Sequence, residues 1–214
     1  DSPPLDGFVP WVVVSVTDKR LGELELDGLP ESSLVGRHPV GVDPHTDYVI
    51  GIFDTGASAH VMGYADAMKA GLYNNSRKFL TNNTSVISGV TGAVDAWVSQ
   101  PLGLFIDGLG AIDPNGLLSD MSNMRGESNV AIMVGQNPGD RPDLPTAIGS
   151  PLSVFFTTVI YNDKQITVNR NDDEFISPEI RIYKHDDSRL PSYPNSIPLE
   201  LRPLGAYAVQ YIPS

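Results

Sequence analysis

The chain has 214 residues, of which 41% are hydrophobic and none is cysteine, and its formal net charge at pH 7 is −12. The apolar share excludes a wholly disordered chain, the lack of cysteine excludes disulfide bonds and thiolate metal sites, and the negative charge argues against nucleic acid as a partner. The 20 glycines and 18 prolines favour many short strands joined by turns, so an all-β protein is expected. No apolar run reaches the roughly 18 residues of a membrane helix, and the acidic composition suits a secreted, periplasmic or otherwise extracytoplasmic protein.

Strand patterns dominate the first part of the chain. Val12–Val16 is a β-branched run, which predicts a strand. Leu24 and Leu26 alternate with acidic residues, as is typical of a half-buried strand. A polar loop is expected over residues 28–47, and the nearly continuous apolar run Tyr48–Phe53 predicts a strand buried on both faces.

One helix and a series of strands are expected in the rest of the chain. The helix is predicted over Tyr64–Ala70, which is rich in helix formers, and Gly71 occupies the position of a left-handed cap. A hairpin turn is expected at Asn162–Lys164, and the polar run Asn169–Glu174 is interpreted as a surface turn or linker. The predicted later strands are Ser85–Val90, Ala93–Val98, Leu102–Ile106, Val130–Val134, Phe155–Tyr161, Gln165–Val168, Glu179–Tyr183, Leu199–Leu201 and Ala206–Ile212.

A short motif, Asp-Thr-Gly-Ala-Ser, follows the predicted buried strand and carries the chemistry. Asp54 would be held in a tight loop, and Gly56 lets the backbone turn without a Cβ clash. The Thr55 hydroxyl can lock this loop to a partner loop, and the Ser58 hydroxyl can hold the backbone of its own loop. Two such carboxylates close together share one proton, so that one activates water while the other protonates a scissile carbonyl.

Further segments extend this pattern along the chain. Gly71-Leu72 follows the predicted helix, a hydrophobic-hydrophobic-Gly element ends at Ile148-Gly149, and a strand pattern follows at Phe155–Ile160. Between them, two β-branched runs enclose a glycine-rich segment made of Ser88, Gly89, Val90, Thr91 and Gly92. In this order and spacing, the motif and these segments resemble one lobe of the pepsin and retropepsin superfamily of aspartic proteases, from about residue 8 to 168.

The resemblance implies a fold, an activity and a set of site residues. The fold is an all-β, pepsin-like lobe of closed, orthogonally packed sheets with one or two short helices. Asp54 is catalytic, Thr55, Gly56 and Ser58 support its loop, and residues 88–92 form the tip of the flap that closes over the substrate. The activity is that of an aspartic endopeptidase acting on a polypeptide, with no cofactor and no metal.

The chain also departs from the family pattern. Met133-Val134-Gly135 fits the hydrophobic-hydrophobic-Gly element as well, so sequence alone leaves two positions for it. Ala57 stands where pepsins often carry a serine, although retropepsins have alanine there. The flap lacks the tyrosine that pepsins carry, and the nearest large aromatic residue, Trp97, is expected in the core. Above all, no second Asp-Thr-Gly or Asp-Ser-Gly is present, so half of the catalytic pair is missing.

The missing carboxylate has two candidate sources, an absent C-terminal lobe and a homodimer partner. We favour the absent lobe, because the segment from Glu179 to Ser214 has strand patterns but is too short to bury a core of its own. The expected organisation is a catalytic lobe over residues 1–168, followed over residues 169–214 by a linker and the incomplete start of a second lobe. The chain alone is then expected to be inactive.

Other function classes fit the sequence less well. A non-catalytic binding or inhibitor module with a pepsin fold is the main alternative, but it has no reason to keep Asp54, Thr55 and Gly56 together; a purely structural β-domain is a third class. A zinc site is disfavoured because no two histidines have helical ligand spacing. A serine triad through Ser58 and His60 is disfavoured because near neighbours in one loop rarely face each other, and no nucleophile-elbow pattern is present.

Overall fold

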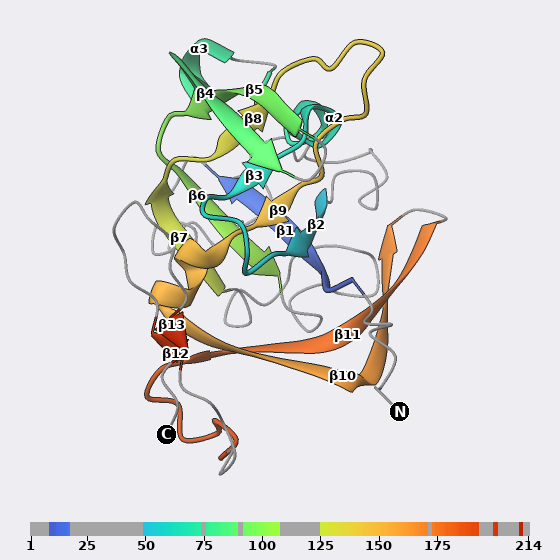
Figure 1. Ribbon diagram of the computed structural model, residues 1–214, viewed down its shortest axis with the longest axis vertical. Helices are drawn as coiled ribbons and strands as arrows, with labels where there is room; N and C mark the ends of the chain where they lie inside the picture. The colour runs from blue at the N-terminus through green and yellow to red at the C-terminus, as the bar shows by residue number, and fades with distance from the viewer. Residues whose placement is uncertain are drawn as a thin grey trace, which may run out of the picture.

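Strands dominate the computed structural model of the chain (Figure 1), which confirms the all-β class. The expected strand at Leu24 and Leu26 and the expected loop over residues 28–47 lie outside the described part. The more specific assignment to a pepsin-like lobe stays a prediction. The structure describes residues 9–17, 49–73, 76–89, 92–107, 125–170, 173–192, 199–200 and 210–211.

A nine-stranded, curled sheet forms the body of the described structure. Its strand order is β4-β5-β8-β3-β9-β2-β1-β6-β7. In that order the strands are β4 (Leu80–Gly89), β5 (Gly92–Ser99), β8 (Met133–Gly135), β3 (Val61–Met62), β9 (Ala147–Ile148), β2 (Val49–Phe53), β1 (Trp11–Thr17), β6 (Leu102–Asp107) and β7 (Arg125–Val130). Most neighbours are antiparallel, but β2 runs parallel to β9 and β3 runs parallel to β8.

The predicted strand Val130–Val134 is wrong, because the chain breaks there into two strands. β7 ends at Val130 and pairs with β6, whereas β8 begins at Met133 and pairs with β3 and β5. Asn129 has a positive φ of 66°, a left-handed backbone conformation at the end of β7. These two strands hold distant positions in the sheet order, yet only two residues separate Val130 from Met133. The three residue steps between them span at most about 10 Å. The sheet must therefore curl until these strands lie close together.

β1 is buried on both faces, as its β-branched sequence allows. Val12, Val14 and Val16 belong to the main hydrophobic core, whereas Val13 faces the other way and packs with Ile50. This second face is covered by a long hairpin, because Ile166 and Phe175 of that hairpin also contact the Val13 cluster. Successive side chains of a strand point to opposite faces, so one run of valines serves both layers.

The covering hairpin consists of β10 (Phe156–Arg170) and β11 (Asp173–Lys184), and it crosses one end of the molecule in Figure 1. The predicted turn at Asn162–Lys164 is wrong: β10 continues through it, with a register shift between Tyr161 and Gln165. The chain reverses instead within the polar run predicted as a surface turn, where Arg170 pairs with Asp173. Strand pairing thus continues across the expected domain boundary at residue 168, while the division into lobes stays a prediction.

The helices are short, and the predicted one is confirmed. α2 (Tyr64–Lys69) has Ala70 as its C-cap residue, and Gly71 has the expected positive φ of 75°. The Asp143 carboxylate accepts the Tyr64 and Ala65 backbone N–H groups at 2.9 and 2.8 Å, which caps the start of the helix.

Three further elements complete the described structure. α3 (Ser76–Phe79), which the sequence did not predict, and the 3₁₀ helix η4 (Ser150–Val154) are single turns. At the C-terminal end, β12 (Leu199–Glu200) and β13 (Gln210–Tyr211) pair with each other, within two of the predicted strand regions. No helix in the described part of the chain is long and apolar enough to cross a membrane.

Candidate active site

Asp54 stands at the point where a buried strand ends. β2 is buried along most of its length, whereas Asp54 itself is exposed. Its carboxylate Oδ1 accepts the Gly56 backbone N–H at 2.8 Å, which fixes the side chain within the turn. Within the described ranges, no lysine or arginine forms an ion pair with this carboxylate. The turn therefore presents a negative charge to solvent while holding one of its oxygens in place.

Backbone hydrogen bonds hold the Asp54 loop from two sides. The Asp54 N–H donates to the Ile148 carbonyl at 2.9 Å, continuing the parallel pairing of β2 with β9. Beyond the turn, the Ser150 N–H donates to the Ala57 carbonyl at 2.8 Å. Inside it, the Ala57 N–H donates to the Asp54 carbonyl at 3.2 Å. Residues 147–150, far away in sequence, thus fix both the entry to the loop and its exit.

The structure distinguishes the two hydrophobic-hydrophobic-Gly candidates by their contacts. Ile148 and Gly149 contact the Asp54 loop, and a Cβ atom on Gly149 would lie 2.4 Å from the Ala59 carbonyl oxygen and 2.7 Å from that of Ala57. Only glycine permits this close approach. Residues 133–135 instead form β8, beside β3 and β5. The candidate site therefore uses Ile148-Gly149.

The two hydroxyl residues of the loop lie on its open side. Thr55 and Ser58 are both exposed. The expected hydrogen bond of the Ser58 hydroxyl within the loop is not seen: in the part of the chain that the structure describes, Ser58 has no side-chain partner, and backbone groups hold the loop instead. The role of Thr55 toward a partner loop stays a prediction.

The expected flap corresponds to an antiparallel hairpin of β4 and β5. Ser88 pairs with Ala93 and Gly89 with Gly92, whose φ is 111°, whereas Val90 and Thr91 lie outside the described residues. β8 pairs only with the base of the hairpin, at residues 96–98 of β5. The half that carries the glycines therefore extends beyond the sheet, and its position relative to Asp54 stays a prediction.

His60, which ends the loop, is a buried residue that the sequence did not reveal as part of the site. Only 1% of it is exposed, and its Nε2 contacts the Glu127 carboxylate of β7. Its Nδ1 accepts the Gly149 N–H at 3.1 Å, and its carbonyl accepts the Met133 N–H at 2.9 Å. His60 and Glu127 are 67 positions apart, so no local pattern could have paired them.

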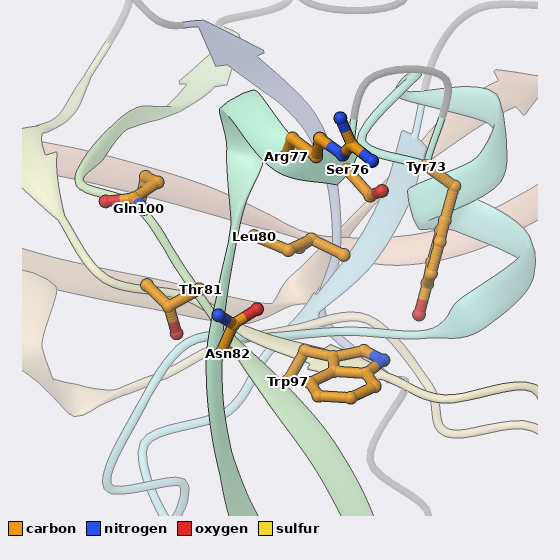
Figure 2. Close-up of a pocket in the computed structure, with 8 residues that line it drawn as sticks. All are labelled: Tyr73, Ser76, Arg77, Leu80, Thr81, Asn82, Trp97 and Gln100. Carbon is orange, nitrogen blue, oxygen red and sulfur yellow. The ribbon is translucent and has the colours of Figure 1, made fainter.

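A pocket of about 670 Å³ opens at the base of the β4–β5 hairpin (Figure 2). Figure 2 shows Tyr73 and Trp97 on one side of it and Gln100 on the other. Trp97 also packs against the main core, as expected, and the Tyr73 hydroxyl donates to the Gly135 carbonyl at 2.6 Å. No sequence pattern predicted this pocket, which is lined by Tyr73, Ser76, Arg77, Leu80, Thr81, Asn82, Trp97 and Gln100.

Metal-binding groups do not cluster in the described ranges, where no three histidine, aspartate or glutamate side chains come together. No protein-family model matches the sequence, and no curated protein matches it.

Proposed function

We propose that the chain is one lobe of an aspartic endopeptidase, in which Asp54 supplies one of two catalytic carboxylates. The observation that carries the proposal is the turn after β2. It combines an exposed carboxylate, an Oδ1 held by the Gly56 N–H, and a loop fixed to Ile148 and Ser150. A carboxylate held in this way is oriented before a substrate arrives, which general acid–base catalysis requires.

A single carboxylate cannot complete the reaction. Peptide hydrolysis needs a base that takes a proton from the attacking water and an acid that gives one to the substrate. Two neighbouring carboxylates that share a proton supply both at once. The second carboxylate comes from a C-terminal lobe outside this chain, which we favour, or from a second copy of the chain.

The β4–β5 hairpin has the place of the flap in this proposal. A polypeptide substrate would lie between the hairpin and Asp54, with the exposed Ser88 and Gly92 near the tip. The acidic net charge of −12 suits an extracytoplasmic enzyme, which we include in the proposal.

Peptide cleavage measured across acidic to neutral pH tests the proposal. The monomeric 214-residue chain should cleave nothing, whereas the chain joined to the segment that follows Ser214 in its gene should cleave peptides, with a peak at acidic or mildly acidic pH. Asp54→Asn should lower that activity by roughly 10²–10⁴-fold, because the amide keeps the shape of the side chain but cannot exchange the proton.

Asp140→Asn is the matched control, since Asp140 is an exposed carboxylate in a turn outside the Asp54 loop. It should leave cleavage unchanged. Full activity of Asp54→Asn would rule out the aspartic protease mechanism, and robust cleavage by a proven monomer would rule out the need for a second carboxylate. If the completed protein bound peptides without cleaving them, the non-catalytic module would be the better description.

A further inference from the structure

The pocket at the base of the β4–β5 hairpin is separate from the Asp54 site. It is lined by Tyr73, by residues of α3 and the start of β4, and by the end of β5 with the residue after it. Neither the Asp54 loop nor residues 147–150 line it. Its volume of about 670 Å³ is within the range of sites that bind small molecules. The pocket is therefore a second place on the molecule where a ligand can be held.

Two aromatic rings form fixed walls of this pocket. The Tyr73 hydroxyl donates to the Gly135 carbonyl, and the Tyr73 ring meets the Tyr64 ring edge-on, with 5.1 Å between the ring centroids. Trp97 belongs to β5, which lies between β4 and β8 in the sheet, and its side chain packs against the main core. Rings held in this way offer flat apolar surface to a ligand and lose little freedom when it binds.

The charge that lines the pocket is opposite to that of the whole chain. The net charge of the chain is −12, yet none of the eight lining residues is an aspartate or a glutamate, and one of them is Arg77. In the part of the chain that the structure describes, the Arg77 side chain forms no ion pair and no hydrogen bond. Figure 2 shows its guanidinium group turned toward the side where Tyr73 lies, with Trp97 across from it. A ligand with a negative group would therefore find a cation without a competing partner among the described residues.

Two amide side chains add neutral hydrogen-bonding groups to the lining. Asn82 and Gln100 are both exposed, and within the described ranges neither amide has a hydrogen-bond partner. Each amide can donate as well as accept, so these groups can orient a polar part of a ligand. They carry no charge, however, and Arg77 is left as the one lining residue that can distinguish an anion from a neutral molecule.

We propose that this pocket binds an aromatic carboxylate, with the ring of the ligand against Trp97 and Tyr73 and its carboxylate on Arg77. A guanidinium group binds a carboxylate through two parallel hydrogen bonds, and aromatic rings stack offset or edge-on. The single cation of the lining matches the single charge of a carboxylate better than the double charge of a phosphate. This site goes beyond the proposed peptide cleavage and does not depend on it.

Titration of the 214-residue chain with 3-phenylpropionate at neutral pH, followed by nuclear magnetic resonance, tests the pocket. The chain has two tryptophans, and the indole N–H resonance of Trp97 should shift until it saturates while that of Trp11 stays in place. The amide 3-phenylpropanamide has the same ring and nearly the same shape but no charge. It should bind roughly five- to tenfold more weakly, a modest factor because Arg77 is exposed and water screens its charge.

Arg77→Gln should remove this preference, so that the acid and the amide bind with similar affinity. Lys78→Gln is the matched control, because Lys78 is the next residue, is also exposed and carries the same charge, but does not line the pocket. This control should keep the preference for the acid. It separates a direct contact with Arg77 from the general attraction of an anion to positive charge.

Trp97→Leu tests the aromatic wall and should weaken the binding of 3-phenylpropionate. If this variant fails to fold, propionate carries the same test with the unmodified chain. Propionate keeps the carboxylate but lacks the ring, so it should not saturate the Trp97 shift at concentrations where 3-phenylpropionate does.

An aromatic carboxylate can be a free small acid or the C-terminal residue of a peptide, and N-acetylglycyl-phenylalanine distinguishes the two. Binding at least as tight as that of 3-phenylpropionate would identify a peptide C-terminus as the source, and weaker binding would identify a free acid. Both results support the carboxylate pocket.

Three results would overturn the proposal. The first is a Trp97 resonance that does not move with 3-phenylpropionate, and the second is equal binding of the acid and the amide by the unmodified chain. The third is a preference for the acid that is lost as much in Lys78→Gln as in Arg77→Gln. Because no measurement here involves cleavage, these results leave the proposed protease function to its own test.

Discussion

At the scale of single residues, Tyr73 shows how burial sets an alkaline limit on stability. Burial raises the pKa of its hydroxyl to about 12, with smaller contributions from Tyr64 and Asp143. Since the unfolded value is about 10, the contribution of Tyr73 to stability is intact below pH ~10 and is lost as the pH rises toward ~12. Tyr73→Phe should therefore reduce the alkaline fall in the free energy of unfolding, measured by urea denaturation at several pH values.

The same variant has a separate effect at neutral pH. There Tyr73→Phe removes the hydrogen bond to the Gly135 carbonyl, which should lower the free energy of unfolding by about 1 kcal/mol. Circular dichroism at neutral pH serves as the control that the fold is kept. If the variant lost stability at alkaline pH as much as the unmodified chain does, the ionisation of Tyr73 would not be the cause of that loss.

Residues that act through a local motif could be predicted from the sequence, and residues that act through the fold could not. Asp54 and Gly56 belong to one short turn, and the structure places the carboxylate against the Gly56 N–H. His60 also follows the motif, but its ring contacts Glu127 and Gly149, which only the tertiary structure brings to it. Even within the loop, the Ser58 hydroxyl was given a bonding role that backbone groups have instead.

At the scale of elements, local composition predicted strands better than it predicted where they turn. Asn162–Lys164 has the residues of a hairpin turn, yet β11 pairs with both sides of it and makes it an irregularity within β10. Long-range pairing overrode the local preference there. The predicted helix Tyr64–Ala70 succeeded because its formers, its Gly71 cap and its position after the loop agreed with one another.

The β10–β11 hairpin is anchored to β1 by Ser177, whose removal should loosen it. Ser177 is fully buried, and its hydroxyl accepts the Trp11 N–H at 3.0 Å, while the Trp11 and Phe175 rings lie 4.9 Å apart. Ser177→Ala removes the hydroxyl that accepts the Trp11 N–H, and it should lower the free energy of unfolding by about 1–3 kcal/mol. Hydrogen exchange should show faster opening of the hairpin than of the nine-stranded sheet.

Ile176→Thr is the matched control for this prediction, because Ile176 precedes Ser177 but is 51% exposed. It should change the exchange rates of the hairpin little, since its side chain points away from β1. Equal loosening by both variants would mean that the anchor is not the Ser177 hydroxyl.

At the scale of the whole molecule, composition was enough to predict the all-β class, but not how the sheet curls. Glycine and proline content indicates many turns, whereas the curl depends on the two-residue connection between β7 and β8. Met133 and Val134 were expected to continue one strand from Val130, because a short apolar run does not reveal which neighbour it pairs with. The connection between β7 and β8 also places Glu127 of β7 near His60, because Met133 of β8 bonds to the His60 carbonyl. The contacts of the candidate site therefore depend on this connection.

The net charge of the whole molecule determines how soluble the chain should be at acidic pH, where the proposed activity is expected to peak. The net charge of −12 at pH 7 falls to zero near the sequence pI of 4.5, and proteins without net charge associate more readily. Val154 and Phe155 expose 63% and 55% of their surface side by side, which offers an apolar contact once repulsion is gone. Light scattering of the 214-residue chain should therefore peak near pH 4.5.

Phe155→Ser should lower that peak without moving its pH, because the variant removes apolar surface and no charge. Val86→Ser, at a 59% exposed position on the β4–β5 hairpin, should lower the peak less. Scattering that does not change between neutral pH and pH 4.5 would show that net charge does not control association, and a shifted peak in Phe155→Ser would show that the variant acts through something other than apolar contact.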